Sequence, residues 1–93
     1  MTTAATAIDR ARAYLDKVPP AISGQNGHGQ TYAVACALVW GFALQEHEAL
    51  ELMREYSARC QPAWTERELL HKVRSAATAT HSKPRGHLLG VTF

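Results

Sequence analysis

The sequence predicts an all-α fold, a compact bundle of about four helices with a glycine-rich loop before the second helix and a basic C-terminal tail. Apolar residues recur at helical spacing in separate segments, and capping residues, prolines or glycines bound these segments. Nothing in the pattern supports a β-sheet core. The chain has 93 residues, 46% of them apolar, which is enough for one domain with a modest core.

The first helix is expected from about Thr6 to Val18. Thr6 and Asp9 have the spacing of a capping box, with Asp in place of the usual Glu or Gln. The pair Pro19-Pro20 ends the helix, because proline lacks the backbone N–H that a helix interior needs. The apolar stripe of this helix comprises Ile8, Ala11, Leu15 and Val18.

A polar, glycine-rich loop from Pro20 to Thr31 leads into the second helix, which is expected from Thr31 to Phe42. This segment is apolar on nearly every face, which is typical of a buried helix. Gly41 near its end suits a C-terminal cap. The loop meets the N-terminus of the helix, where unpaired backbone N–H groups favour anions, so a ligand site is expected there first.

The third helix is expected from Gln45 or Glu46 to about Ala58. Glu46 and Glu48 lie in its first turn, where the helix dipole favours acids, and Arg59 follows its last turn, where the dipole favours a base. Its apolar stripe, which we expect in the core, comprises Ala49, Leu50, Leu52, Met53 and Tyr56.

The fourth helix has the clearest start signal in the chain and is expected to run to about Thr78. Thr65 and Glu68 fit a capping box, and Trp64 and Leu69 have the spacing of a hydrophobic staple. We expect Trp64 and Tyr56 in the core; the alternative is that one of them is a stacking platform beside a phosphate-binding patch of basic residues. The buried face of the helix comprises Leu69, Leu70, Val73, Ala76 and Ala77.

The chain is divided into a helical bundle at residues 1–79 and a basic tail or linker at residues 80–93. Residues 69–93 contain no acid, so one end of the molecule is expected to be electropositive, although a net charge of +2 does not by itself indicate a nucleic-acid partner. The apolar residues of the tail either dock as a short extended piece or belong to a linker; they are Leu88, Leu89, Val91 and Phe93.

The two cysteines and the hydropathy pattern predict a cytoplasmic protein with reduced thiols. Cys36 and Cys60 form no C-x-x-C pair, and no secretory signal is present. Cys36 is expected as a small core residue. The longest apolar run, at residues 32–40, is too short to span a membrane, so no membrane partner is expected. The histidine and cysteine spacing does not support a metal site.

The stretch from Gly24 to Thr31 has the glycine and threonine spacing of a phosphate-binding P-loop. Gln30 stands where that motif requires the lysine that reaches the phosphates, so ATP hydrolysis is not predicted. Two interpretations stay open, a loop that binds a phosphate at a helix start, with His28 as donor, and a plain surface loop. The basic residues that would extend such a site are Arg59, Lys72, Arg74, Lys83 and Arg85.

Several short motifs occur in a characteristic order between Ala11 and Ala77. They are Ala13-Tyr14-Leu15, Pro20-Ala21-Ile22-Ser23-Gly24-Gln25-Asn26-Gly27-His28 with Thr31, Gly41-Phe42-Ala43-Leu44, Glu48-Ala49, Glu55-Tyr56, Arg59-Cys60-Gln61-Pro62-Ala63-Trp64, and Glu68-Leu69 with Lys72-Val73. In this order they resemble the primase C-terminal helical domain of plasmid, phage and mobile-element replication proteins. In that family the domain follows a primase–polymerase domain and often precedes a helicase.

The resemblance implies a non-catalytic accessory domain of DNA replication that binds single-stranded DNA template and nucleotide during primer initiation. It implies no cofactor beyond ATP with Mg²⁺ as a bound ligand, and the primase–polymerase and helicase domains of the parent protein as partners. One departure is Gly29, where the family often has an acidic or polar residue, which leaves the second helix without a side-chain cap. The candidate DNA- and nucleotide-binding residues are Gly24, Gln25, Asn26, Gly27, His28, Thr31, Arg59, Lys72 and Arg74.

An alternative function is a docking module that links primase to helicase or another replication partner. This alternative predicts an exposed apolar patch and no affinity for DNA. The sequence leaves open whether the chain is a stand-alone protein or an excised domain. The polymerase segment with its metal-binding acids is absent from these residues, so the chain is not expected to synthesise a primer alone.

Overall fold

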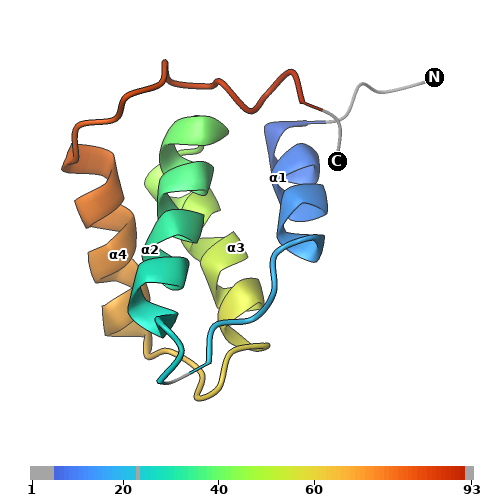
Figure 1. Ribbon diagram of the computed structural model, residues 1–93. Coiled ribbons are helices and arrows are strands. Elements are labelled where there is room, and N and C mark those ends of the chain that lie inside the picture. The colour runs from blue at the N-terminus through green and yellow to red at the C-terminus, as the bar shows by residue number, and fades with distance from the viewer. Residues whose placement is uncertain (1–5, 23, 92–93) are drawn as a thin grey trace.

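The computed structural model describes residues 6–22 and 24–91, and within them the protein is an all-helical bundle. Figure 1 shows α2 in front of α3, with α1 and α4 on either side. The described residues form no strand, only one isolated bridge between Ile22 and Gln61. The predicted fold class is therefore confirmed. The elements are α1 (Ala7–Asp16), α2 (Gly27–Cys36), the π-helical segment η1 (Ala37–Gly41), α3 (Glu46–Ser57) and α4 (Glu66–Thr78).

Capping determines where α1 begins and a distant side chain caps its end. The Thr6 hydroxyl accepts a hydrogen bond from the Asp9 backbone N–H at 3.1 Å, and the Asp9 carboxylate accepts one from the Thr6 N–H at 3.2 Å. The predicted capping box is thus confirmed, although α1 ends at Asp16 and not at Val18. Past that end, the Arg59 guanidinium donates to the carbonyl oxygens of Leu15 at 2.8 Å and Val18 at 3.2 Å.

The second helix begins at Gly27, four residues before the predicted start at Thr31. Asn26 takes the left-handed conformation, with φ of 59°, and holds the N-cap position. Gly27 then packs so closely on the preceding loop that a Cβ there would lie 3.2 Å from the Ile22 carbonyl oxygen. Residues 27–30 have weak intrinsic helix propensity, so this packing decides the boundary.

The end of the second helix also differs from the prediction, because the chain changes to a π-helix at Ala37. Gly41 is not the left-handed cap; Ala43 reverses the chain instead, with φ of 52°. Gly41 is required for a different reason, since Leu88 of the tail packs where its Cβ would stand. The helix is central but not buried on every face, because Gly29 and Ala33 are exposed.

The core lies among α1, α2, η1, α3 and α4, and Tyr56 is its largest fully buried side chain. The Tyr56 hydroxyl donates to the Pro19 carbonyl oxygen at 2.9 Å and accepts from the Gln30 side-chain amide at 3.2 Å. The predicted core positions of Met53 and Tyr56 are confirmed. Cys36 differs from its prediction, because it is only partly buried.

The tail docks across one end of the bundle, which corresponds to the top of Figure 1. The backbone N–H groups of Gly86 and Leu88 donate to the carbonyl oxygens of Trp40 at 2.7 Å and Gly41 at 2.9 Å. The Trp40 indole N–H donates in turn to the Lys83 carbonyl oxygen at 2.6 Å. The described part of the tail therefore docks in turns and is not extended, while Phe93 lies outside the described residues. The division at residue 79 stays a prediction.

The fourth helix begins as predicted, with a capping box. The Thr65 hydroxyl accepts from the Glu68 N–H at 3.2 Å, and Glu68 Oε1 accepts from the Thr65 N–H at 3.0 Å. We expect Thr65→Ala to lower the free energy of unfolding by about 1 kcal/mol, because the first turn loses its side-chain acceptor. Urea denaturation followed by circular dichroism measures this change. Thr65→Ser, which keeps the hydroxyl, should retain most of the wild-type free energy of unfolding.

Candidate functional site

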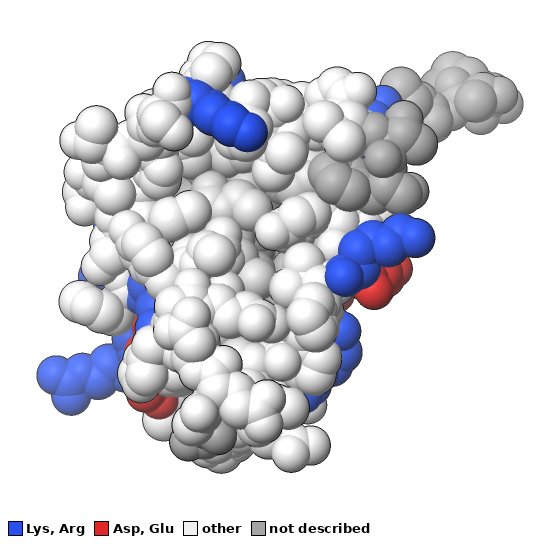
Figure 2. Space-filling view, in the orientation of Figure 1, with Lys and Arg blue, Asp and Glu red and all other residues white. Residues whose placement is uncertain are grey.

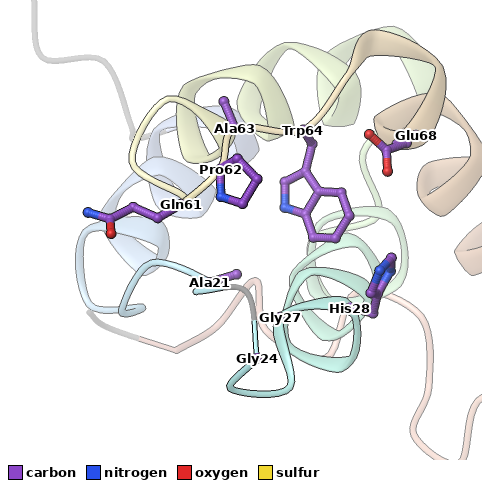
Figure 3. A pocket seen from close by; sticks show the side chains of 9 residues that line it. All are labelled: Ala21, Gly24, Gly27, His28, Gln61, Pro62, Ala63, Trp64 and Glu68. Atoms are coloured by element: carbon purple, nitrogen blue, oxygen red, sulfur yellow. The ribbon is translucent and has the colours of Figure 1, made fainter.

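A pocket of about 230 Å³ lies where the start of α2 meets the segment before α4 (Figure 3). Gln61 joins the two segments at its base, because the Gln61 N–H donates to the Ala21 carbonyl oxygen at 2.9 Å. The residues that line the pocket are Ala21, Gly24, Gly27, His28, Gln61, Pro62, Ala63, Trp64 and Glu68.

In the described part of the chain no helix is long and apolar enough to cross a bilayer.

One wall of the pocket belongs to a cluster of His28, Trp64 and Lys72, which we call the Trp64 cluster. The His28 ring meets the indole at 71°, with the ring centroids 4.7 Å apart. The Lys72 ammonium lies 4.6 Å from the centroid of the indole ring and 3.4 Å from His28 Nδ1. A cation at this distance is attracted to the negative face of the ring, so the contact fixes the position of the Lys72 charge.

The start of α2 contributes backbone N–H groups to the same region. Asn26 is the N-cap residue and makes no side-chain capping bond, whereas Gly29, to which the sequence attributed the missing cap, lies inside the helix. Gly24 has φ of 84°, which suits glycine, and Gly29 stands where a Cβ would meet Asn26 Oδ1 at 2.6 Å. The positive end of the helix dipole therefore lies beside the pocket with its first-turn N–H groups uncapped by side chains.

A second, shallower hollow of about 500 Å³ runs from the pocket along α4; we call it the α4 groove. Its lining residues are His28, Arg67, Glu68, His71 and Lys72. It shares His28 and Glu68 with the pocket, so the two hollows are adjacent. Figure 2 shows basic side chains projecting from the left edge of the molecule, where α4 lies.

The charged side chains of the α4 groove differ in whether they are already bonded to other residues. Neither Arg67 nor Lys72 forms an ion pair with another described residue. Hydrogen bonds from the Thr65 N–H and hydroxyl lower the pKa of Glu68, and the nearby His28 and Lys72 lower it further, so Glu68 is ionised at neutral pH. The groove thus presents two cations outside any ion pair and one carboxylate, which caps α4 and lies near Lys72.

The structure gathers only some of the predicted site residues. Gly24, Gly27 and His28 line the pocket, Lys72 lines the groove, and Gln25 and Asn26 are exposed just before α2. Two basic residues are engaged elsewhere and line neither hollow. Arg59 caps α1, and the Arg74 guanidinium pairs with Glu46 at 3.2 Å.

Thr31 is a correction to the predicted site, because it is 0% exposed and lies in the core. It stands in the second turn of α2, since that helix begins at Gly27, and its hydroxyl has no hydrogen-bond partner among the described residues. Trp64 is a second correction, because it is half-buried and lines the pocket. Arg67 and His71 were also missed. Their spacing of four residues on α4, matched by that of Glu68 and Lys72, was the available signal.

Comparison with known proteins identified no family model, no curated protein and no solved structure that matches this chain. The resemblance to the primase C-terminal domain therefore stays a prediction from the motifs. Among the described residues, no three His, Cys, Asp or Glu side chains are grouped so that they could hold a metal ion.

Proposed function

We propose that this chain is a non-catalytic accessory domain that binds single-stranded DNA and nucleotide. One observation carries the proposal: the Trp64 cluster places an indole ring and a cation between an open pocket and a basic groove. Proteins that bind single strands combine aromatic side chains with a positively charged groove in the same way. The replication context, with a primase–polymerase and a helicase as partner domains, rests on the motif resemblance alone.

The α4 groove supplies the contacts to phosphate. Lys72 and Arg67 carry charges that no described carboxylate pairs with, and the start of α2 adds its dipole beside them. Each phosphate that a lysine or arginine neutralises releases condensed counterions from the strand. Binding should therefore weaken as salt concentration rises, and the dependence should report how many phosphates the groove contacts.

The alternative function, a docking module between replication proteins, has a smaller basis in the structure. Among the described residues the large apolar side chains that are exposed are Leu89, at 36%, and Val91, at 41%, both in the tail. Two such side chains do not form the dominant apolar patch that the alternative predicts. Affinity for single-stranded DNA separates the two functions.

We expect Lys72→Ala to weaken binding of a short single-stranded DNA and to reduce its salt dependence. The slope of log K against log salt should fall by about 0.7, the value for one phosphate contact on a single strand. Fluorescence anisotropy with a labelled oligonucleotide, between about 50 and 200 mM salt, measures both quantities. Lys17→Ala is the matched control, because Lys17 is exposed at the end of α1 and lines neither hollow.

Two results would contradict the proposed function. The first is no binding of the wild-type chain at the lowest salt concentration. The second is an equal loss of affinity in Lys72→Ala and Lys17→Ala, because the binding would then depend on net charge and not on the α4 groove. Circular dichroism on each variant shows whether the fold is retained.

A further inference from the structure

We infer that the pocket is a base subsite: a nucleobase enters the pocket beside Trp64 while its phosphate lies in the α4 groove. The inference rests on the proposed function and assigns separate parts of the nucleotide to the two hollows. It also gives Trp64 a role in binding that the motif resemblance does not assign. The ligand is one nucleotide unit, either free or within a single strand.

The distribution of charge between the two hollows supports this assignment. No lysine or arginine lines the pocket, whereas both cations of the Trp64 region, Arg67 and Lys72, line the α4 groove. An anionic phosphate is stabilised beside the cations, and it is disfavoured in the pocket, where the ionised Glu68 carboxylate stands without a lysine or arginine. His28 and Glu68 line both hollows, so one nucleotide can occupy the pocket and the groove together.

The pocket wall suits a flat, mostly apolar ring. Pro62, Ala63 and Trp64 form one side, and the small residues Ala21 and Gly27 form part of the other (Figure 3). Trp64 lines the pocket, whereas Lys72, which lies over the indole ring, does not. A volume of about 230 Å³ is below the roughly 300–1,000 Å³ of pockets that enclose whole drug-sized ligands, which fits a single ring system.

The indole nitrogen of Trp64 also supports the binding of a base in the pocket. It is buried and has no hydrogen-bond acceptor among the described residues. Figure 3 shows it on the side of the ring toward Pro62 and Ala21, which both line the pocket. A buried N–H without an acceptor is unfavourable, and nucleobases carry ring nitrogens and carbonyl oxygens that accept hydrogen bonds. A base that opens this side of the pocket slightly would supply the missing acceptor.

The test compares a thymidine oligonucleotide with an abasic strand of the same length and phosphate number. The full chain should bind the intact strand at least about fivefold more tightly, since stacking of one base on an aromatic ring contributes that much or more. Trp64→Leu should remove this preference while keeping the salt dependence. Trp64→Phe, which keeps an aromatic ring but lacks the N–H, should retain part of it.

The indole N–H signals in NMR spectra of the ¹⁵N-labelled wild-type chain give a readout that does not depend on the folding of any variant. The Trp64 signal should move downfield with the intact strand and with thymidine monophosphate, and it should stay in place with inorganic phosphate. The Trp40 signal is the internal control, because its N–H already donates to the Lys83 carbonyl oxygen. Movement with the monophosphate shows that a free nucleotide is sufficient, and movement with the strand alone shows that the unit must be part of a chain.

The outcomes separate the inference from the proposed function. Equal affinity for the intact and abasic strands, with a normal salt slope, would overturn the base subsite and leave the proposed function in place. A preference for the intact strand that persists in Trp64→Leu would overturn the subsite too, because the base would then be held elsewhere. Absence of binding to both strands would overturn both proposals.

Discussion

Tyr56→Ala is expected to lower the free energy of unfolding by about 3–5 kcal/mol, the range for removing a large buried aromatic side chain. Tyr56 is 1% exposed and is the largest of the fully buried side chains. Its hydroxyl also joins α3 to the loop before α2, through the Pro19 carbonyl oxygen, and to α2, through the Gln30 amide. A domain of this kind has a total stability of about 5–15 kcal/mol, so the variant should be close to unfolding.

Urea denaturation followed by circular dichroism measures this loss. Tyr56→Phe is the matched control, because it keeps the buried ring and removes only the hydroxyl that donates to Pro19. It should cost about 0.5–1.5 kcal/mol, the net contribution of one hydrogen bond, because the Gln30 amide still donates to the Pro19 carbonyl oxygen. A loss below about 1 kcal/mol in Tyr56→Ala would show that the core does not depend on this side chain.

Gly41→Ala is expected to displace the tail and to lower the free energy of unfolding by about 1–3 kcal/mol, as overpacking of a closed site does. A Cβ at Gly41 would overlap Leu88 Cδ1 and lie 2.9 Å from Leu88 Cγ. The two backbone hydrogen bonds that hold the tail, from Gly86 to Trp40 and from Leu88 to Gly41, should then weaken.

Amide hydrogen exchange at Gly86 and Leu88 measures the displacement directly, because both N–H groups should lose protection. Gly90→Ala is the control, since a Cβ there has open space around it. Leu88→Ala should reduce the additional cost of Gly41→Ala, because the two atoms that collide are then absent. Unchanged exchange in Gly41→Ala would show that the tail is not held by this contact.

Short-range signals in the sequence predicted the fold class and most helix boundaries. The capping boxes of Thr6 with Asp9 and of Thr65 with Glu68 join residues three positions apart, so their spacing is readable without a structure. The start of α4 at Glu66 follows directly from the second of these boxes. The apolar stripe of α3 was equally readable, because helical spacing alone puts Met53 and Tyr56 on one face.

The start and end of the second helix depended on contacts that the sequence does not display. Gly27 and His28 are weak helix formers, and they are helical because Asn26 is left-handed and Gly27 packs against Ile22. Gly41 had the local pattern of a helix cap, whereas Leu88, far along the chain, decides that a glycine must stand there. Packing between distant segments overrode local propensity at both ends.

The candidate site was also predictable from local sequence in part and decided by packing in part. The sequence by itself predicted a candidate site in the polar stretch from Gly24 to Thr31, with His28 in it, because glycines and polar residues that lead into a helix are a local pattern, although α2 already begins at Gly27. It could not show that His28, Trp64 and Lys72 meet, since α2 and α4 bring them together only by packing. Nor could it show that the Arg59 guanidinium donates hydrogen bonds to the carbonyl oxygens of Leu15 and Val18 at the end of α1, more than 40 positions away. Spacing along the chain determined most of the helices, and the packing of the helices decided which side chains lie together at the candidate site.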